Sequence, residues 1–174
     1  MSREYLVTSG TLDVQNSLVE ILPFDLLLNQ ETIDTYLTNF TLLRSDLRVR
    51  VQILSNPMQY GMVMVSKLPY RTTAPETTYS SLQQLSQANP QFIDIAGENQ
   101  VEMILPYTRP ELYRLIVDSG KDWKVYLRLI SLDTATTEAP TSLQYQVYAS
   151  FVNPQAAMYR VPPAQLQSFQ PGVA

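Results

Sequence analysis

A strict alternation of apolar and polar side chains runs along residues 46–54 of this chain. Apolar residues at every second position from Leu47 to Ile53 alternate with Arg and Gln. A period of two predicts a β-strand with one buried face, because successive side chains of a strand point to opposite sides. Ser55-Asn56-Pro57, which follows, is typical of a turn. The chain therefore supplies a sheet whose apolar face must pack against a second layer.

Similar short segments recur along the 174 residues, separated by clusters of Pro, Asn, Gly and Thr. Residues 60–68 carry apolar side chains on both faces, with Met62 and Met64 on one and Val63 and Val65 on the other. This pattern predicts a strand that is covered on both sides. Eight strands are expected in all, at residues 5–14, 18–28, 46–54, 60–68, 91–95, 100–107, 123–132 and 143–152.

Two short helices are expected between the strands. Asn29 can cap the first, since Ile33 and the apolar residues up to Phe40 follow helical spacing. The second begins at Ser80-Ser81-Leu82-Gln83, a capping-box pattern, and ends before Pro90. An all-β, eight-stranded antiparallel jelly roll with two helical insertions fits this order. An immunoglobulin-like sandwich is also allowed by the pattern alone.

The chain contains no His and no Cys. This excludes Ser–His and Cys–His nucleophilic catalysis and the common zinc and iron sites. We therefore expect no catalytic residue, no cofactor and no metal site. Only 16% of the residues are charged, which is typical of a surface that is buried in an assembly but also of a soluble β domain rich in Ser, Thr and Gln. The net charge is −4 and no run of Lys or Arg occurs, so this domain is not expected to grip nucleic acid strongly by itself. No segment approaches the length of a membrane span.

The order of several segments resembles the capsid proteins of picorna-like viruses. The strand of Asp46–Pro57 ends in Asn and a short turn. An aromatic-Gly pair, Tyr60-Gly61, then opens a second apolar strand that ends at Pro69. The resemblance extends over residues 5–155 and is greatest to the dicistrovirus, iflavirus and marnavirus branches. Further segments similar to this family are Gln91–Asp94, Val101–Tyr107 and Gln146–Pro154.

The resemblance implies strands B to I in chain order, forming two sheets, B-I-D-G and C-H-E-F. Residues 1–4 would be a remnant of the N-terminal arm, 5–160 the jelly-roll domain and 161–174 an extended C-terminal tail. The implied function is that of a structural subunit of an icosahedral, pseudo T=3 capsid that packages a positive-strand RNA genome. The implied location is the virion, assembled in the host cytoplasm. The implied partners are other capsid subunits with homologous jelly rolls and, at the level of the shell, genomic RNA and a host receptor.

The loops at the ends of the sandwich are the predicted inter-subunit contacts, since the family's loop ends meet at the five-fold and quasi-six-fold axes. The candidate loops are 71–79, 110–122 and 133–142. Tyr and Arg dominate interface hot spots, so side chains of these types should matter most. The candidate contact residues are Arg71, Tyr79, Tyr113, Arg114, Lys121 and Glu138.

Other residues favour structural roles. Gly61 is expected at a tight turn or bulge, and Trp123 in the core. Arg48 and Arg50 share one strand face and favour ion pairs over RNA contact. The acids Asp94, Glu98 and Glu102 favour solvated positions over a glycosidase pair.

A carbohydrate- or ligand-binding jelly-roll module, such as a lectin, is the alternative function. The 11 tyrosines of the chain keep it open, because a lectin would present exposed aromatic side chains on one sheet.

Overall fold

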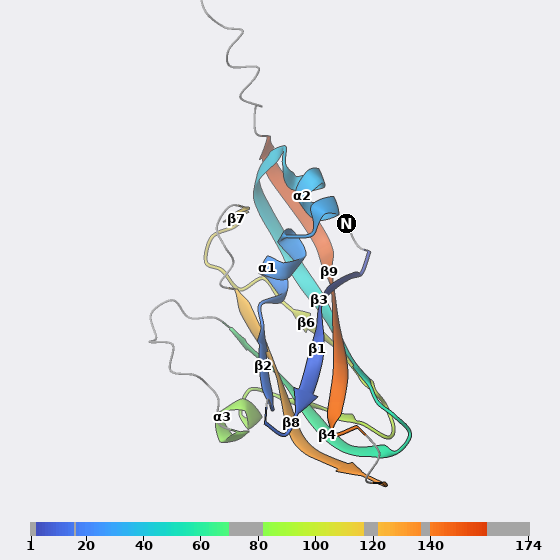
Figure 1. Ribbon diagram of the computed structural model, residues 1–174. Helices are drawn as coiled ribbons and strands as arrows, with labels where there is room; N and C mark the ends of the chain where they lie inside the picture. Colours follow the sequence, from blue (N-terminus) through green and yellow to red (C-terminus); the bar gives the residue numbers. More distant parts are fainter. Residues whose placement is uncertain (1–2, 16, 70–81, 117–121, 137–139, 160–174) are drawn as a thin grey trace, which may run out of the picture.

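Two antiparallel sheets pack face to face in the computed structural model of the chain (Figure 1). The structure describes residues 3–15, 17–69, 82–116, 122–136 and 140–159. The first sheet has the order β1 (Tyr5–Asp13), β9 (Ser142–Tyr159), β3 (Phe40–Leu54) and β6 (Gln100–Leu105). The second has the order β2 (Leu18–Ile21), β8 (Trp123–Thr134), β4 (Gln59–Pro69) and β5 (Gln91–Asp94). These are the orders B-I-D-G and C-H-E-F, so the predicted jelly roll is confirmed. A two-residue strand, β7 (Arg114–Leu115), adds to β3 and was not predicted.

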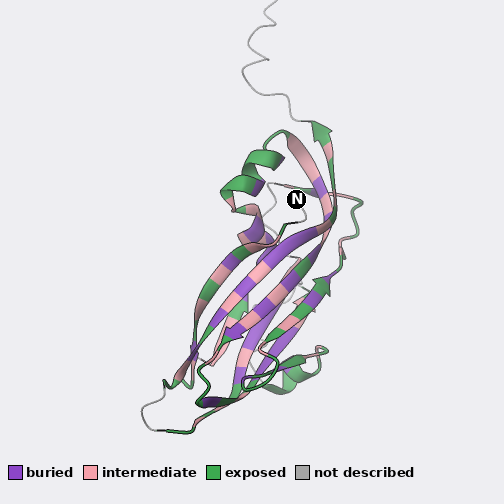
Figure 2. Ribbon diagram, turned by 90° about the vertical axis from the view of Figure 1, so that its right-hand side faces the viewer, coloured by how far each residue is buried: buried purple, intermediate pink, exposed green. Residues whose placement is uncertain are grey.

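The predicted alternation of β3 is confirmed. Its apolar residues from Leu47 to Ile53 are at most 2% exposed, whereas the side chains between them lie on the outer face. Val49 is opposite Ala149 of β9 and Val51 is opposite Val147, so the buried face continues across the strands. Figure 2 shows the resulting stripes of buried and more exposed residues along the first sheet. The inner faces of both sheets share one hydrophobic core.

Both β3 and β9 are longer than predicted. β3 begins at Phe40 rather than at residue 46, and β9 continues to Tyr159 rather than ending at residue 152. The register between the two strands shifts between Arg44 and Asp46. There the hydroxyl of Ser45 donates to the carbonyl oxygens of Asp46 (2.7 Å) and Val152 (3.0 Å). At this shift β9 carries one extra residue relative to β3. The burial alternation of β3 continues, but the buried position 45 holds a polar Ser, which is why the apolar pattern of the sequence stopped there.

The prediction of a strand over residues 18–28 is wrong beyond Ile21. Residues Pro23–Leu28 form a helix, α1, which buries Phe24 and Leu27. Proline is favoured in the first turn of a helix, where its missing N–H has no partner to lose. The ring of Phe24 meets Phe151 edge to face, with centroids 5.7 Å apart. α1 therefore closes one end of the core.

The two predicted helices are present but are shorter or begin differently. α2 (Glu31–Leu37) starts after Gln30, which makes no side-chain cap hydrogen bond, and Asn29 instead ends α1. The expected capping role of Asn29 is therefore wrong. α3 (Leu82–Ser86) follows the predicted Ser80-Ser81 cap, which lies outside the described residues.

Trp123 confirms its predicted role, because it packs against the core at the start of β8. Of the predicted terminal segments, Arg3 and Glu4 are described and the tail 161–174 lies outside the described residues.

Candidate functional site

The predicted contact residues fall into three groups in the structure. Arg71, Tyr79, Lys121 and Glu138 lie outside the described residues. Tyr113 lies partly buried next to β7. Arg114, the first residue of β7, has a side chain with no exposed surface.

Arg114 takes part in a cluster at the base of the connection between β6 and β8. Its guanidinium lies over the ring of Phe24, 4.0 Å from the ring centroid. Its Nη1 is 2.6 Å from Oδ2 of Asp122, and the other oxygen of this carboxylate accepts a hydrogen bond from Nε of Arg109. Asp122 thus bridges two arginines from the same connection. The charged group of Arg114 is therefore satisfied inside its own chain, and its contact with a neighbouring subunit stays a prediction.

Sequence reasoning missed Asp122 and Arg109 as partners of this cluster. They lie 8 and 5 residues from Arg114, and no regular pattern of side chains links the three positions in the sequence. The one available signal was the chemistry, since a buried Arg requires a carboxylate or aromatic partner. The cluster joins the two ends of the 106–122 connection, so it fixes the base of a loop that was predicted to make subunit contacts.

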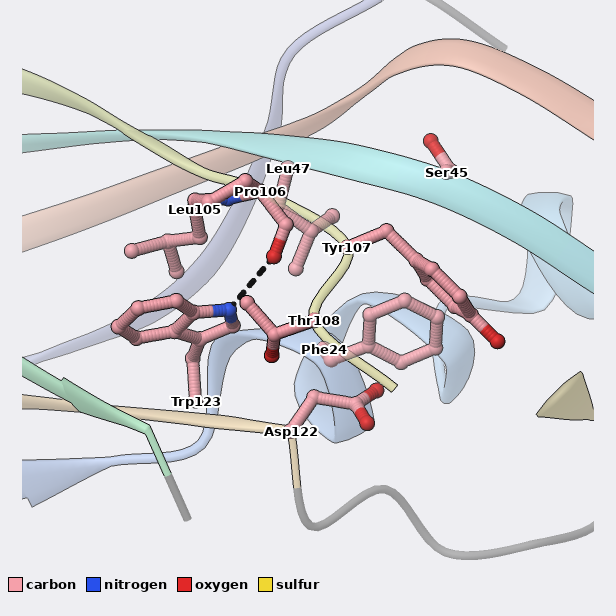
Figure 3. A pocket seen from close by; sticks show the side chains of 9 residues that line it. All are labelled: Phe24, Ser45, Leu47, Leu105, Pro106, Tyr107, Thr108, Asp122 and Trp123. Carbon is pink, nitrogen blue, oxygen red and sulfur yellow. Dashed lines mark hydrogen bonds between the residues drawn. The ribbon is translucent and has the colours of Figure 1, made fainter. Parts of the chain in front are cut away.

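A small pocket adjoins this cluster, between Tyr107, Asp122 and Trp123 (Figure 3). The indole N–H of Trp123 donates to the carbonyl oxygen of Pro106 at 2.7 Å, across one side of the pocket. The pocket has room for roughly one water molecule. It is therefore too small for a sugar or a cofactor, which occupy sites of several hundred Å³.

Tyr107 is the only described residue with a buried side-chain oxygen or nitrogen that lacks a hydrogen-bond partner. Burial raises the pKa of its hydroxyl, an effect that nearby Arg109 opposes and Asp122 reinforces. Its backbone N–H donates to Oδ1 of Asp46 at 2.8 Å, and Arg44 lies 5.4 Å from its ring centroid. These contacts hold the start of the 106–122 connection against β3.

The outer face of the first sheet is polar and carries paired charges. Nε of Arg48 is 3.1 Å from Glu102, and Nη2 of Arg50 is 2.8 Å from Glu4. The guanidinium of Arg50 also lies 4.3 Å from the ring centroid of Tyr148. The predicted surface ion pairs are therefore confirmed. Because each arginine already has a carboxylate partner, this face offers no net positive charge to nucleic acid.

Among the described residues, Asp94 and Glu102 do not form the carboxylate pair of a glycosidase. Glu102 binds Arg48, whereas Oδ1 of Asp94 accepts the backbone N–H of Ala96 at 3.0 Å. Among the described residues, no group of three or more acids could hold a metal ion. No helix in the described parts is long and apolar enough to cross a membrane.

The outer face of the second sheet is only partly covered. Leu85 of α3 packs against Met64 and Tyr126, and the hydroxyl of Ser66 donates to the carbonyl oxygen of Leu85 at 3.0 Å. Met64 is therefore covered on the side away from the core, as predicted for a two-sided apolar strand. Met62 carries the same sequence signal but is 40% exposed in this chain.

Comparison with known proteins identifies the family to which this chain belongs. Residues 1–131 match the picornavirus capsid protein family, Rhv. The chain belongs to this family. It is therefore a viral capsid protein. A relative from Cricket paralysis virus, a structural polyprotein, is 31% identical over 117 residues. That match covers 65% of this chain but only 13% of the polyprotein, so this capsid protein spans a small part of its relative.

Solved virion structures share the fold of this capsid protein. A marine algae virus of the order Picornavirales matches with a TM-score of 0.80 and 18% identity, over 92% of this chain and 73% of that chain. Triatoma virus matches with a TM-score of 0.78 and 20% identity, over 91% of this chain and 67% of that chain. Black queen cell virus matches with a TM-score of 0.78 and 21% identity, over 91% and 71%. These likenesses give no support to the lectin-like alternative.

Proposed function

We propose that this capsid protein tiles an icosahedral shell of pseudo T=3 symmetry together with homologous jelly-roll subunits. The observation that carries the proposal is the exposure of large apolar side chains on the isolated chain. They lie on strands of both sheets, among them Ile104 of β6 (48%) and Phe92 of β5 (53%). A monomeric protein rarely leaves such side chains in contiguous patches, whereas an assembly covers them. Many moderate contacts suffice, since a closed symmetric shell repeats each of them.

The proposed shell packages a positive-strand RNA genome and binds a host receptor, and both interactions belong to the shell rather than to this chain alone. The net charge of −4 supports this division. So does the pairing of Arg48 and Arg50 with carboxylates, because nucleic-acid binding requires an excess of positive charge. RNA affinity of the isolated chain should therefore be no greater than that of an acidic control protein at the same salt concentration.

The loops remain the proposed contacts at the symmetry axes, with Arg71, Tyr79, Tyr113, Lys121 and Glu138 as candidates. Arg114, the sixth candidate, ranks last, because its side chain is buried within the chain. Tyr113→Ala tests the set within the described residues. We expect it to lower shell stability while leaving the unfolding midpoint of the isolated chain nearly unchanged. Particles of unchanged heat stability would remove Tyr113 from the interface.

Electron microscopy of the co-expressed subunits tests the proposed function. The chain is produced with the other capsid subunits encoded beside it, and the product is examined by negative stain without dissociation. Closed icosahedral shells that contain this chain are the expected result. A homogeneous monomer across all salt and pH conditions, alongside shells that lack it, would overturn the proposal.

A further inference from the structure

Four apolar side chains form an uncovered patch on the outer face of the second sheet. Met62 is central, at 40% exposure, and its strand neighbour Tyr60 is 49% exposed. Ile130 of β8 is 41% exposed and Phe92 of β5 is 53% exposed. We refer to Tyr60, Met62, Phe92 and Ile130 as the β4 patch. It lies on the same sheet against which α3 packs, where Leu85 of α3 covers the neighbouring Met64 and Tyr126.

The strand register places these four side chains on one face. Phe92 pairs with Met64, one step along the outer face from Met62. The register between β4 and β8 shifts at Met62, which is opposite Ser131, whereas Val63 is opposite Leu129. Ile130 is thus the extra residue of a β-bulge, and a bulge puts two successive side chains on the same side of a strand. Without the bulge, the strict alternation of β8 would separate Ile130 from Ser131.

Gly61 keeps this bulge in place. Its φ of +145° is a conformation that side chains disfavour, and a Cβ there would lie 2.2 Å from the carbonyl oxygen of Ser131. The backbones of β4 and β8 therefore approach closely at Gly61, at the same bulge that turns Ile130 toward Met62. The arrangement is built into the backbone and does not depend on one flexible side chain.

Carboxylates flank the β4 patch on both sides. Asp94 pairs with Met62 across β5, and Asp133 pairs with Tyr60 across β8. Both residues are exposed. Neither forms an ion pair with any residue that the structure describes. An apolar centre with a charged rim is the anatomy of a protein interface, and an acidic rim selects a partner whose rim is cationic.

We infer that the β4 patch docks a different capsid subunit through an apolar surface flanked by Lys or Arg. A second copy of this chain fits less well, because two of its sheet arginines, the exposed Arg48 and the partly buried Arg50, already bind Glu102 and Glu4. They would have to give up these partners in order to neutralise Asp94 and Asp133. The inference rests on the assembly proposed above and specifies one surface of that assembly.

Photo-crosslinking identifies the occupant. The photoreactive aromatic p-benzoylphenylalanine replaces Phe92, and the chain is co-expressed with the other capsid subunits. In purified shells we expect crosslinks to a different subunit, within a peptide that contains apolar residues and Lys or Arg. Crosslinks to a second copy, to RNA or within the chain itself would overturn the inference. Sedimentation of the isolated parent chain should show a monomer at micromolar concentration, and self-association that Met62→Asp abolishes would also overturn it.

Two matched pairs of variants test the chemistry of the patch. Met62→Asp should lower shell yield by about tenfold or more, whereas Met62→Leu should leave it unchanged. Asp133→Lys should lower the yield more than Asp133→Asn, since Lys would face a cation. The unfolding midpoint of each isolated variant should stay within a few degrees of the parent. If the parent forms no shells, the proposed function fails. If the parent forms shells and Met62→Asp does so equally well, only this inference fails.

Discussion

The guanidinium of Arg114 lies 4.0 Å from the centroid of the Phe24 ring and is held there by the carboxylate of Asp122. Phe24 in turn packs edge to face on Phe151, a residue of the sheet core. The charge therefore lies directly against the apolar interior. Burying an Arg costs desolvation energy, which an aromatic face and an ionised carboxylate offset. The base of the 106–122 connection is thus held by interactions that require both charges.

Asp122→Asn should destabilise the fold by about 3 kcal/mol, because it leaves the buried charge of Arg114 without its carboxylate. Urea unfolding of the isolated chain measures the effect. Glu102→Gln is the matched control, since it breaks an ion pair with Arg48 whose side chains are 45% and 49% exposed. Pairs exposed to this degree contribute about 0.5 kcal/mol. Equal losses in the two variants would contradict a structural role for the buried cluster.

Gly61→Ala should destabilise the chain by about 2 kcal/mol or more, because its Cβ would collide with the backbone of Ser131 at a φ of +145°. Gly97→Ala is the control. Its Cβ would meet only the carboxylate of Asp94, at 3.1 Å, and a side chain can move aside. Its cost should stay below about 1 kcal/mol. Thermal unfolding of both variants measures the difference, and a tolerated Gly61→Ala would show that the bulge does not need glycine.

The sequence predicted those parts of the fold in which a single periodic pattern of apolar residues determines the structure. In β3, the alternation from Leu47 to Ile53 is visible because one face of the strand is buried and the other is not. The pattern fails at Ser45, because a polar residue occupies a buried position of β3 there, opposite a bulge in β9. It also fails at α1, because an apolar run without polar interruptions does not distinguish a buried strand from a buried helix. Pro23 was the local signal that favoured a helix.

The candidate site was predicted less completely than the fold, for a physical reason. Loop position and residue type indicated Tyr113 and Arg114 equally, but burial separates them. Arg114 is buried because Asp122 and Phe24 converge on it in three dimensions, and nothing in their sequence spacing shows this. The sequence also did not predict the exposure of Met62. An apolar residue on a strand gives the same sequence pattern whether a helix of its own chain or a partner subunit covers it.

Tyr145→Phe should reduce the loss of stability at alkaline pH. Burial raises the pKa of the Tyr145 hydroxyl above its ordinary value of 10.0. The folded chain then holds this proton more tightly than the unfolded chain does. Below about pH 10 the free energy of unfolding is unaffected, and it falls as the pH rises through the folded pKa. Urea unfolding at neutral pH and just above pH 10 should show a larger loss for the parent than for the variant. Identical losses would mean that Tyr145 ionises equally in both states.

Gln59→Glu should destabilise the chain more than Gln59→Met does. The amide of Gln59 is 3% exposed, and its Nε2 donates to the carbonyl oxygens of Pro140 (2.6 Å) and Ser142 (3.0 Å). Its Oε1 accepts the backbone N–H of Asn56 at 2.8 Å. One side chain therefore joins the turn before β4 to the start of β9. The carboxylate of Glu has the same shape as the amide of Gln. It has no proton to donate to the two carbonyl oxygens, and we expect this loss to cost about 3 kcal/mol.

Methionine at residue 59 fills the same volume and leaves those carbonyl groups unpaired, without adding charge repulsion. Its cost should be about 1–2 kcal/mol. Lowering the pH through the carboxyl pKa should restore part of the stability of Gln59→Glu, because the protonated acid donates a hydrogen bond again. The Met variant lacks a titrating group and should show no such recovery. Unfolding free energies at pH 7 and at about pH 5 measure both effects, and a Glu variant as stable as the Met variant at pH 7 would show that the two carbonyl contacts do not hold the turn.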